Sequence, residues 1–148
     1  TKMFQEIINA HLKNDILPIV NENDITSTPE QLFGDNDQLS ANVAYAIDAE
    51  LLVILSDIDG YYDANPDKHK DAKLYKVLDH IPRGALDEDF TPKNPFATGG
   101  IVTKLMAADF LLKHKKKMFL CNGFDLESAR SFLLEDKHTL GTLFEPSK

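Results

Sequence analysis

The sequence lacks tryptophan and holds a single cysteine, Cys121, among its 148 residues. One cysteine excludes an internal disulfide and favours a reducing compartment, so we expect a cytoplasmic protein in which Cys121 is a small apolar residue at a strand end. The sequence also has no apolar run approaching the roughly 20 residues of a membrane-spanning helix. Its amphipathic, charged start does not resemble a signal peptide. We therefore expect no membrane partner.

Basic residues are scarce, because 16 lysines and arginines face 24 aspartates and glutamates, which gives a formal net charge of -8. This balance argues against nucleic acid as the main partner, although it leaves room for an anionic ligand in a local pocket. The 43% share of hydrophobic residues predicts one domain with a core of its own. The histidines show no metal-ligand spacing, so we expect no protein metal site and no structural zinc. They are His11, His69, His80, His114 and His138.

Hydrophobic periodicity predicts an α/β fold with a mostly parallel open sheet sandwiched between helices. The predicted helices are 2–14, 37–48, 105–112 and 128–134, and the predicted strands are 16–20, 51–55, 118–121 and 139–144. Residues 74–81 are ambiguous between a strand and a helical turn. The run 51–55 has no polar alternation, which predicts a central strand covered on both faces. Thr1 is the only capping residue before the first helix, which suggests that the chain begins part-way through a larger protein.

The segment from Asn21 to Asp37, whose sequence is NENDITSTPEQLFGDND, carries a polar cluster at each of its two ends. Residues 21–24 follow the first predicted strand, and ligands bind at the carboxyl ends of strands in open α/β sheets. The alternative for this cluster is a solvated loop. Residues 35–37 lie at the start of the predicted helix 37–48, where the alternative is N-capping. We expect one of the three to cap the helix and at least one to face a ligand.

A third polar cluster, SDIDG, follows the predicted strand 51–55 at what should be the same edge of the sheet. The alternative is a tight turn in which Gly60 supplies a positive φ. The spacing does not fit a calcium-binding loop, because the acidic series stops at Asp63 and no later glutamate completes it.

The segment ATGGIVTK, residues 97–104, places a glycine pair at the start of a helix and a lysine in its first turns. Such a turn lets backbone N–H groups approach a phosphate, and the lysine adds a positive charge. It is not a Walker A loop. An ordinary glycine-rich turn before a helix is the alternative. The polar, proline-rich segment 82–95 predicts a mobile loop or a lid.

These segments, in this order, resemble the amino acid kinase family. The similarity is carried by PIVNEND, by FGDND followed by LSA, by LLVILSDIDGYYDANP, by ATGGIVTKL and by GTLF. Within the family the chain is most similar to the members that phosphorylate the γ-carboxylate of L-glutamate with ATP at the start of proline biosynthesis. The family's usual Gly-Thr-Gly-Gly-Met turn is changed here, with Ala97 before Thr98 and Ile101 after Gly100.

The resemblance implies roles for the matching positions. Asn21, Asp24 and Asn36 correspond to substrate-binding positions, and Asp37 and Lys104 correspond to catalytic ones, with Asp37 holding catalytic lysines in place. Implied nucleotide-binding residues are Ser56, Asp57, Thr98, Gly99, Gly100, Ile101, Val102, Thr103 and Lys104. The implied cofactors are ATP and Mg²⁺.

The resemblance also implies L-glutamate and ATP as ligands, proline as a feedback inhibitor, and a homo-oligomer. The family's first strand, which carries a lysine, and its glycine-rich phosphate loop do not occur in this sequence. We therefore expect residues 1–148 to be the C-terminal portion of one kinase domain, with no second domain. Two other interpretations stay open: a nucleotide- or proline-binding module without turnover, and a kinase of the same family with a different small-molecule acceptor.

Overall fold

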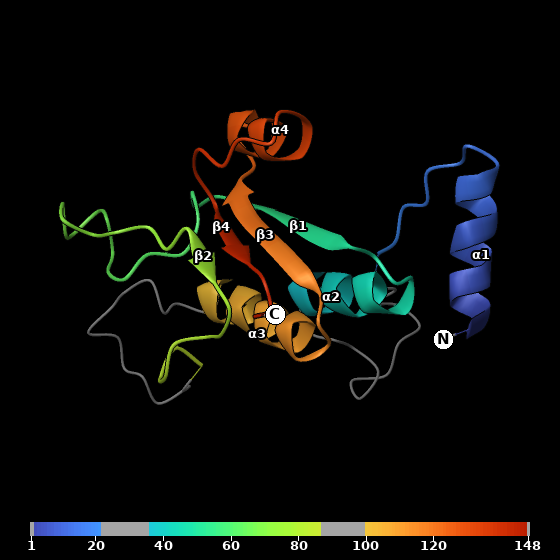
Figure 1. Ribbon diagram of the computed structural model, residues 1–148, viewed down its shortest axis with the longest axis horizontal. Helices are drawn as coiled ribbons and strands as arrows, with labels where there is room; N and C mark the ends of the chain where they lie inside the picture. Colours follow the sequence, from blue (N-terminus) through green and yellow to red (C-terminus); the bar gives the residue numbers. More distant parts are fainter. Residues whose placement is uncertain (1, 22–35, 87–99, 148) are drawn as a thin grey trace.

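A computed structural model describes residues 2–21, 36–86 and 100–147 of the chain (Figure 1). The helices are α1 (Lys2–Lys13), α2 (Asn36–Ala46), α3 (Gly100–Lys113) and α4 (Glu127–Leu134). The strands are β1 (Leu51–Ser56), β2 (Val77–Leu78), β3 (Lys117–Asn122) and β4 (Thr142–Phe144). None of the described helices is long and apolar enough to cross a membrane.

The described strands form one sheet in the order β1-β3-β4-β2. Strand β1 pairs with β3 in parallel, and β2 pairs with β4 in parallel, whereas β3 and β4 are antiparallel. The parallel register runs from Leu51 opposite Lys117 to Ser56 opposite Asn122, so the carboxyl ends of β1 and β3 lie at one edge. The predicted α/β fold with a mostly parallel open sheet is confirmed.

Strand β3 is the centre of the core because its side chains alternate between two apolar layers. Met118 and Leu120 pack in the cluster that contains the buried faces of α2 and α3. Phe119 and Cys121 pack in a second cluster with α4. All four side chains are fully buried. Cys121 is thus a small apolar core residue, as expected from the sequence.

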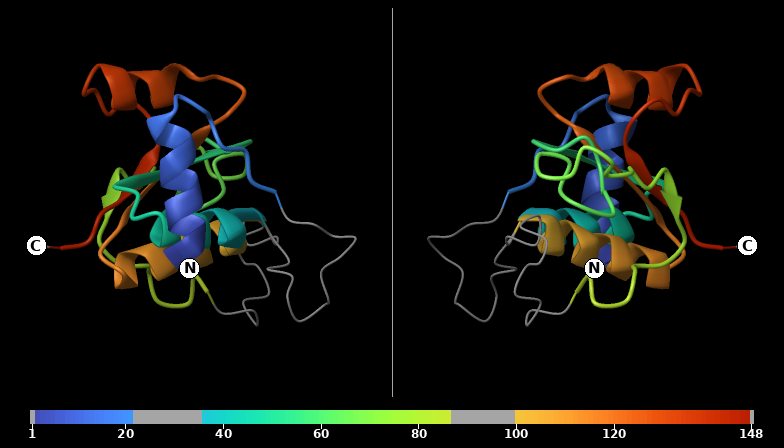
Figure 2. Two further views of the ribbon diagram at one scale, coloured as in Figure 1. Left: turned by 90° about the vertical axis from the view of Figure 1, so that its right-hand side faces the viewer. Right: turned by 90° about the vertical axis from the view of Figure 1, so that its left-hand side faces the viewer.

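Helices cover both faces of the sheet, as Figure 2 shows: α2 and α3 lie on one side and α4 on the other. Alanines allow α2 and α3 to approach closely, since Ala41 on α2 and Ala107 on α3 are fully buried. On the opposite face the ring of Phe132 in α4 stacks on Phe119 with centroids 4.0 Å apart. This layered arrangement confirms the predicted sandwich.

The predicted buried strand 16–20 is wrong. No strand is assigned there, and Leu17 and Ile19 are 80% and 90% exposed. A strand requires a neighbour that completes its hydrogen-bond ladder, and no described strand pairs with this segment. Pro18 would in addition remove one donor from such a ladder. The apolar run alone therefore did not determine a strand.

The prediction for residues 51–55 is correct in type but wrong in position. Strand β1 is parallel, yet it lies at one edge of the described sheet, and Leu55 is 51% exposed. The central place belongs to β3. The ambiguous segment 74–81 contains the short strand β2, and an isolated bridge joins Tyr62 to Leu74. Most of the predicted lid lies outside the described residues, because 87–99 are not described.

Candidate functional site

The carboxyl ends of β1 and β3 form one polar edge of the sheet. Ser56 ends β1 and its hydroxyl donates to Oδ1 of Asp57 at 3.0 Å. The main-chain N–H of Gly123, just after β3, donates to the carbonyl of Ser56 at 2.7 Å. Next to it, the amide of Asn122 donates to Oδ1 of Asp59 at 2.9 Å. The SDIDG turn is therefore tied to the end of the neighbouring strand.

Helices α2 and α3 begin at this same edge. Helix α2 leads into β1, and α3 leads into β3, through short connections, so each helix runs back against the strand that follows it (Figure 1). Their amino ends consequently lie toward the carboxyl ends of β1 and β3. Unpaired N–H groups and the helix dipole make such ends favourable places for anions.

An ion pair joins the two helices where they begin. Lys104 Nζ donates to Asp37 Oδ2 at 3.1 Å, and the hydroxyl of Thr103 donates to the same oxygen at 2.9 Å. The side chains of Lys104 and Asp37 are only 16% and 15% exposed. Lys104 Nζ also donates to the carbonyl of Gly100 at 3.2 Å. These bonds hold the ammonium group over the first turn of α3.

The position of Asp37 suits both a structural and a chemical role. It lies in the first turn of α2, where a carboxylate complements the helix dipole. Its contacts nevertheless cross to Thr103 and Lys104 on α3, which capping of α2 does not require. Asp37 thus orients Lys104, and this fixes a positive charge at the amino end of α3, where an anion could bind.

A cavity of about 500 Å³ runs along α2 and the start of β1, and Asn21 and Asn36 both line it. Its other polar side chain is Ser40, and the rest of its lining is apolar, with Leu39, Val43 and Ile47 from one face of α2. Two of the three predicted substrate residues therefore share one cavity. The third, Asp24, lies outside the described residues.

The predicted nucleotide-binding turn is described from Gly100 onward, whereas Thr98 and Gly99 lie outside the described residues. An added Cβ at Gly100 would meet nothing within 4 Å, so the backbone there is open to a ligand. The Ile101 side chain is buried in the core, and Val102 packs against that core. Only their backbone groups can therefore face a phosphate. The Thr103 hydroxyl already bonds to Asp37.

Sequence reasoning missed one polar contact in this region. The side-chain amide of Gln38 on α2 donates to the main-chain carbonyl of Thr103 on α3 at 3.1 Å. A glutamine in the first turn of a helix usually faces solvent, so nothing in the pattern around Gln38 distinguishes it.

Two tyrosines that follow the SDIDG turn have raised pKa values. Burial raises the pKa of the Tyr61 hydroxyl, and the adjacent Tyr75, whose ring stacks at 5.3 Å, raises it further. The pKa of Tyr62 is raised by burial and then by the charge of Asp59. Burial also raises the pKa of the Cys121 thiol. All three groups stay protonated at neutral pH, which leaves none of them as a ready nucleophile.

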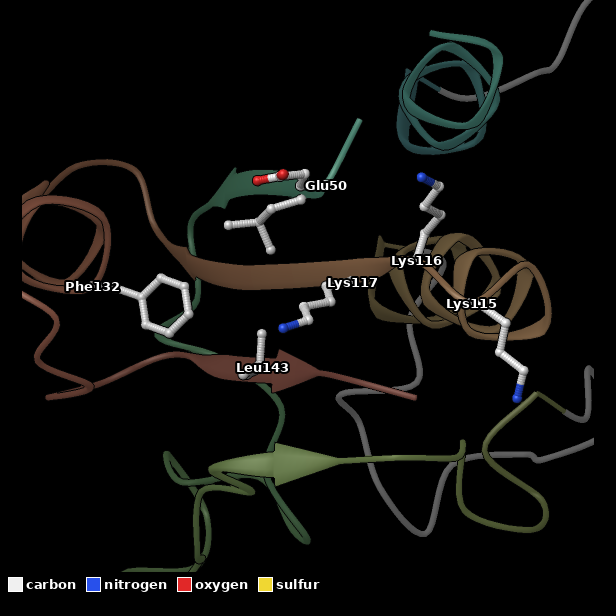
Figure 3. Close-up of a pocket in the computed structure, with 7 residues that line it drawn as sticks. Glu50, Lys115, Lys116, Lys117, Phe132 and Leu143 are labelled. Carbon is white, nitrogen blue, oxygen red and sulfur yellow. The ribbon is translucent and has the colours of Figure 1, made fainter. Parts of the chain in front are cut away.

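A second cavity of about 430 Å³ lies at the amino ends of β1 and β3 (Figure 3). Lys117 crosses it toward Leu143, with Phe132 opposite, whereas Lys116 points toward α2 (Figure 3). Lys116 pairs with Asp48, and Lys117 pairs with Glu145 at 2.6 Å. The cavity is at the opposite end of the strands from Lys104, whereas ligands in open α/β sheets bind beyond the carboxyl ends of the strands. It is the weaker candidate for chemistry on an anionic ligand.

Within 2–21, 36–86 and 100–147, no three His, Cys, Asp or Glu side chains gather as a metal site would require. The described carboxylate nearest to Lys104 is that of Asp37, and it is bonded to two donors. Kinase sites commonly bind Mg²⁺ through the phosphates of the nucleotide and only one or two carboxylates.

Curated proteins named glutamate 5-kinase are similar to nearly the whole chain. The protein from Wolinella succinogenes is 54% identical over 148 residues, which cover 97% of this chain and 57% of that protein. The one from Helicobacter hepaticus is 50% identical over 147 residues, which cover 99% and 56%. The one from Leishmania donovani is 52% identical and covers 93% and 54%. The chain thus spans somewhat more than half the length of these relatives.

Solved structures share the fold at low sequence identity. A UMP kinase from Bacillus anthracis superposes with a TM-score of 0.68 at 18% identity, covering 97% of this chain and 52% of that one. An isopentenyl phosphate kinase superposes with a TM-score of 0.66 at 21% identity, covering 93% and 49%. At such identities the likeness concerns the fold alone. The model of the amino acid kinase family matches residues 1–122, and the chain belongs to that family.

Proposed function

We propose that the protein carrying these residues transfers the γ-phosphoryl group of ATP to the γ-carboxylate of L-glutamate. The product is glutamyl 5-phosphate, and the reaction is the first step of proline biosynthesis in the cytoplasm. In this proposal residues 1–148 are the C-terminal portion of one amino acid kinase domain. Support comes from relatives of 50–54% identity that are named glutamate 5-kinase.

The observation that carries the proposal is the shielded ion pair of Asp37 and Lys104 between the first turns of α2 and α3. Phosphoryl transfer depends mainly on positioning and on positive charge near the transferring group. A lysine held by a carboxylate at a helix amino end supplies that charge at a fixed place. Asn21 and Asn36 line the adjoining cavity, where an amino acid would bind.

The acceptor needs no general base. A glutamate side chain has a pKa of about 4.3 and is ionised at neutral pH. One of its oxygens attacks the γ-phosphorus, the bond from that phosphorus to the bridging oxygen of the β-phosphate breaks, and ADP leaves with the electron pair. Lys104 neutralises charge on the phosphoryl oxygens, while Asp37 fixes the position of Lys104. Mg²⁺, held by the phosphates of ATP, would neutralise part of their charge.

Substrate recognition is proposed to use complementary side chains. The amides of Asn36 and Asn21 can donate to the substrate carboxylate, and the carboxylate of Asp24 can accept from its ammonium group. For the nucleotide we propose Ser56, the last residue of β1, and Asp57, which follows it. The turn 98–104 would bind the ATP phosphates. Inhibition by proline and assembly as a homo-oligomer are further proposals that rest on the resemblance to the family.

The test is an acceptor panel with the intact protein, Mg²⁺-ATP and hydroxylamine, in which ADP release and hydroxamate formation are both measured. ADP release that requires glutamate, together with glutamate hydroxamate, is the expected result. Nucleotide binding without ADP release would identify a binding module instead. ADP release only with a different acid or with a phosphate ester would identify another kinase of the family. Addition of EDTA should abolish the reaction, because it removes Mg²⁺ from ATP.

A further inference from the structure

We propose that Gln38 is a positioning residue for Lys104: its amide locks α3 against α2 so that the ion pair of Lys104 and Asp37 is held in one geometry. This inference rests on the proposed function for its kinetic consequence. The structural part of the inference is that Gln38 restrains Lys104, and chemical labelling of Lys104 can test it without enzymatic turnover.

The contact of Gln38 complements those of the adjacent Asp37. The Asp37 carboxylate binds the side chains of Thr103 and Lys104, whereas the Gln38 amide binds the main chain of Thr103 at 3.1 Å. Side-chain bonds alone allow the α3 backbone to shift while the long lysine follows. A bond to the backbone itself removes that freedom. Two consecutive residues of α2 thus fix both the side chains and the backbone of the same turn of α3.

The packing between α2 and α3 explains why the hydrogen bond from Gln38 to Thr103 matters for the position of α3. By helical spacing, Ala107 lies on α3 between Thr103 and His114, and both of these residues contact α2. Ala107 is fully buried, and so is Ala41 on the facing helix. Small side chains let helices approach closely but form few interlocking contacts that would prevent sliding. Ring contacts of Tyr45 with Phe110 and His114 hold the far end of the interface. The hydrogen bond of Gln38 restrains the backbone of α3 at the near end, where Lys104 lies.

Asn42 provides a matched control one turn further along α2. Its amide also donates to a main-chain carbonyl, that of Gln38, at 2.8 Å, and it is also partly buried. This bond stays within α2 and does not reach α3. A general effect of removing a side-chain amide from α2 would appear at both positions. An effect of the connection between the helices would appear only at Gln38.

The kinetic experiment uses the intact protein with Gln38→Met, which keeps the length of the side chain but removes the donor, and with Asn42→Leu. For Gln38→Met we expect kcat to fall roughly 5- to 20-fold, because a small misplacement of a charged group costs transition-state stabilisation. The KM values for ATP and glutamate should stay within about twofold, and Asn42→Leu should resemble wild type. In a Lys104→Ala background, Gln38→Met should reduce kcat no further.

The second experiment measures the rate of reductive methylation of Lys104 by mass spectrometry, with Lys113, whose side chain is 70% exposed, as the internal reference. Gln38→Met should raise the relative rate at Lys104 roughly threefold or more, because the pair opens more often, and Asn42→Leu should not. If wild type shows no glutamate-dependent turnover, the proposed function fails while labelling still decides the role of Gln38. Equal labelling of Lys104 in all variants would overturn the inference. So would a loss of kcat from Gln38→Met that persists without Lys104.

Discussion

At the scale of single residues, the candidate site depends on the Asp37 carboxylate, which accepts more than one hydrogen bond. Asp37 Oδ2 accepts from Lys104 Nζ and from the Thr103 hydroxyl, and both donors come from α3. The ion pair is shielded from solvent, so it is screened less by salt than an exposed pair. Removing one partner of such a pair leaves the other charge shielded and uncompensated, which is costly. The pair should therefore behave as a unit in mutational tests.

Lys104→Ala should lower kcat by roughly 10²-fold or more, the scale expected when a donor to the transition state is lost. Lys113→Ala is the control, because Lys113 lies on the same helix, is largely exposed and pairs only with Asp109 among the described side chains. Its kcat should stay within about twofold of wild type. Coupled ADP release measures both variants. An unchanged kcat for Lys104→Ala would remove this lysine from the mechanism.

Asn36→Ala should raise the KM for glutamate by roughly tenfold or more and leave the KM for ATP nearly unchanged, because the lost amide would no longer pair with the substrate carboxylate. The same split is expected for Asp24→Ala. Steady-state kinetics with each substrate varied in turn provide the measurement. Equal changes in both KM values would indicate a folding defect and would contradict a specific role in glutamate binding.

At the scale of secondary-structure elements, the site depends on the spacing between α2 and α3. Alanines at the interface allow the close approach that brings Asp37 within reach of Lys104. A larger side chain there has to push the helices apart or adopt a strained rotamer. The geometry of the ion pair at the amino ends of the two helices is therefore coupled to packing one turn away.

Ala107→Leu should reduce the free energy of unfolding by about 1–3 kcal/mol and lower kcat as well, because overpacking displaces α3 from α2. Met106→Leu is the control on the same helix, since Met106 is 46% exposed, and it should change stability by less than about 0.5 kcal/mol. Urea denaturation and ADP release measure the two effects. An unchanged free energy of unfolding for Ala107→Leu would contradict this prediction, because it would mean that the interface has room for the larger side chain.

The turn before β4 depends on a glycine. Gly141 has a φ of +90°, and a Cβ there would lie 2.4 Å and 2.6 Å from two ring atoms of the buried Phe119. Gly141→Ala should therefore destabilise the protein by about 2–4 kcal/mol, as backbone strain and overpacking combine. Gly100→Ala has open space and should leave the urea midpoint nearly unchanged. Equal midpoints for the two variants would contradict this account of Gly141.

At the scale of the whole molecule, local sequence patterns predict most helices and strands but not which strands lie next to one another in the sheet. Helices α1, α2 and α4 and strand β3 follow from hydrophobic spacing, which is a local property. The order β1-β3-β4-β2 and the antiparallel β4 depend on contacts between distant segments. For the same reason residues 16–20, although apolar, form no strand, and β1 lies at the edge of the described sheet.

The candidate site likewise has residues that local sequence patterns indicate and residues that only contacts between distant segments reveal. Polar residues at the end of β1 and at the start of α2, and a glycine turn before α3, are visible as local patterns, so Ser56, Asn36 and Gly100 could be named as candidates from the sequence. The roles of Asp37 and Lys104 came from the resemblance to the family, and their 3.1 Å contact joins residues 67 positions apart. Gln38 has no local signal, since its partner is a backbone carbonyl 65 positions away.

The most direct test of the account is an experimental structure of the intact protein with L-glutamate, Mg²⁺ and a non-hydrolysable ATP analogue. We expect the terminal phosphate to lie within about 3 Å of Lys104 Nζ and the glutamate carboxylate to lie at the Asn36 amide. Both ligands should lie at the carboxyl ends of β1 and β3. A nucleotide bound beside Lys117 at the opposite ends of these strands, or glutamate bound away from Asn36, would contradict it.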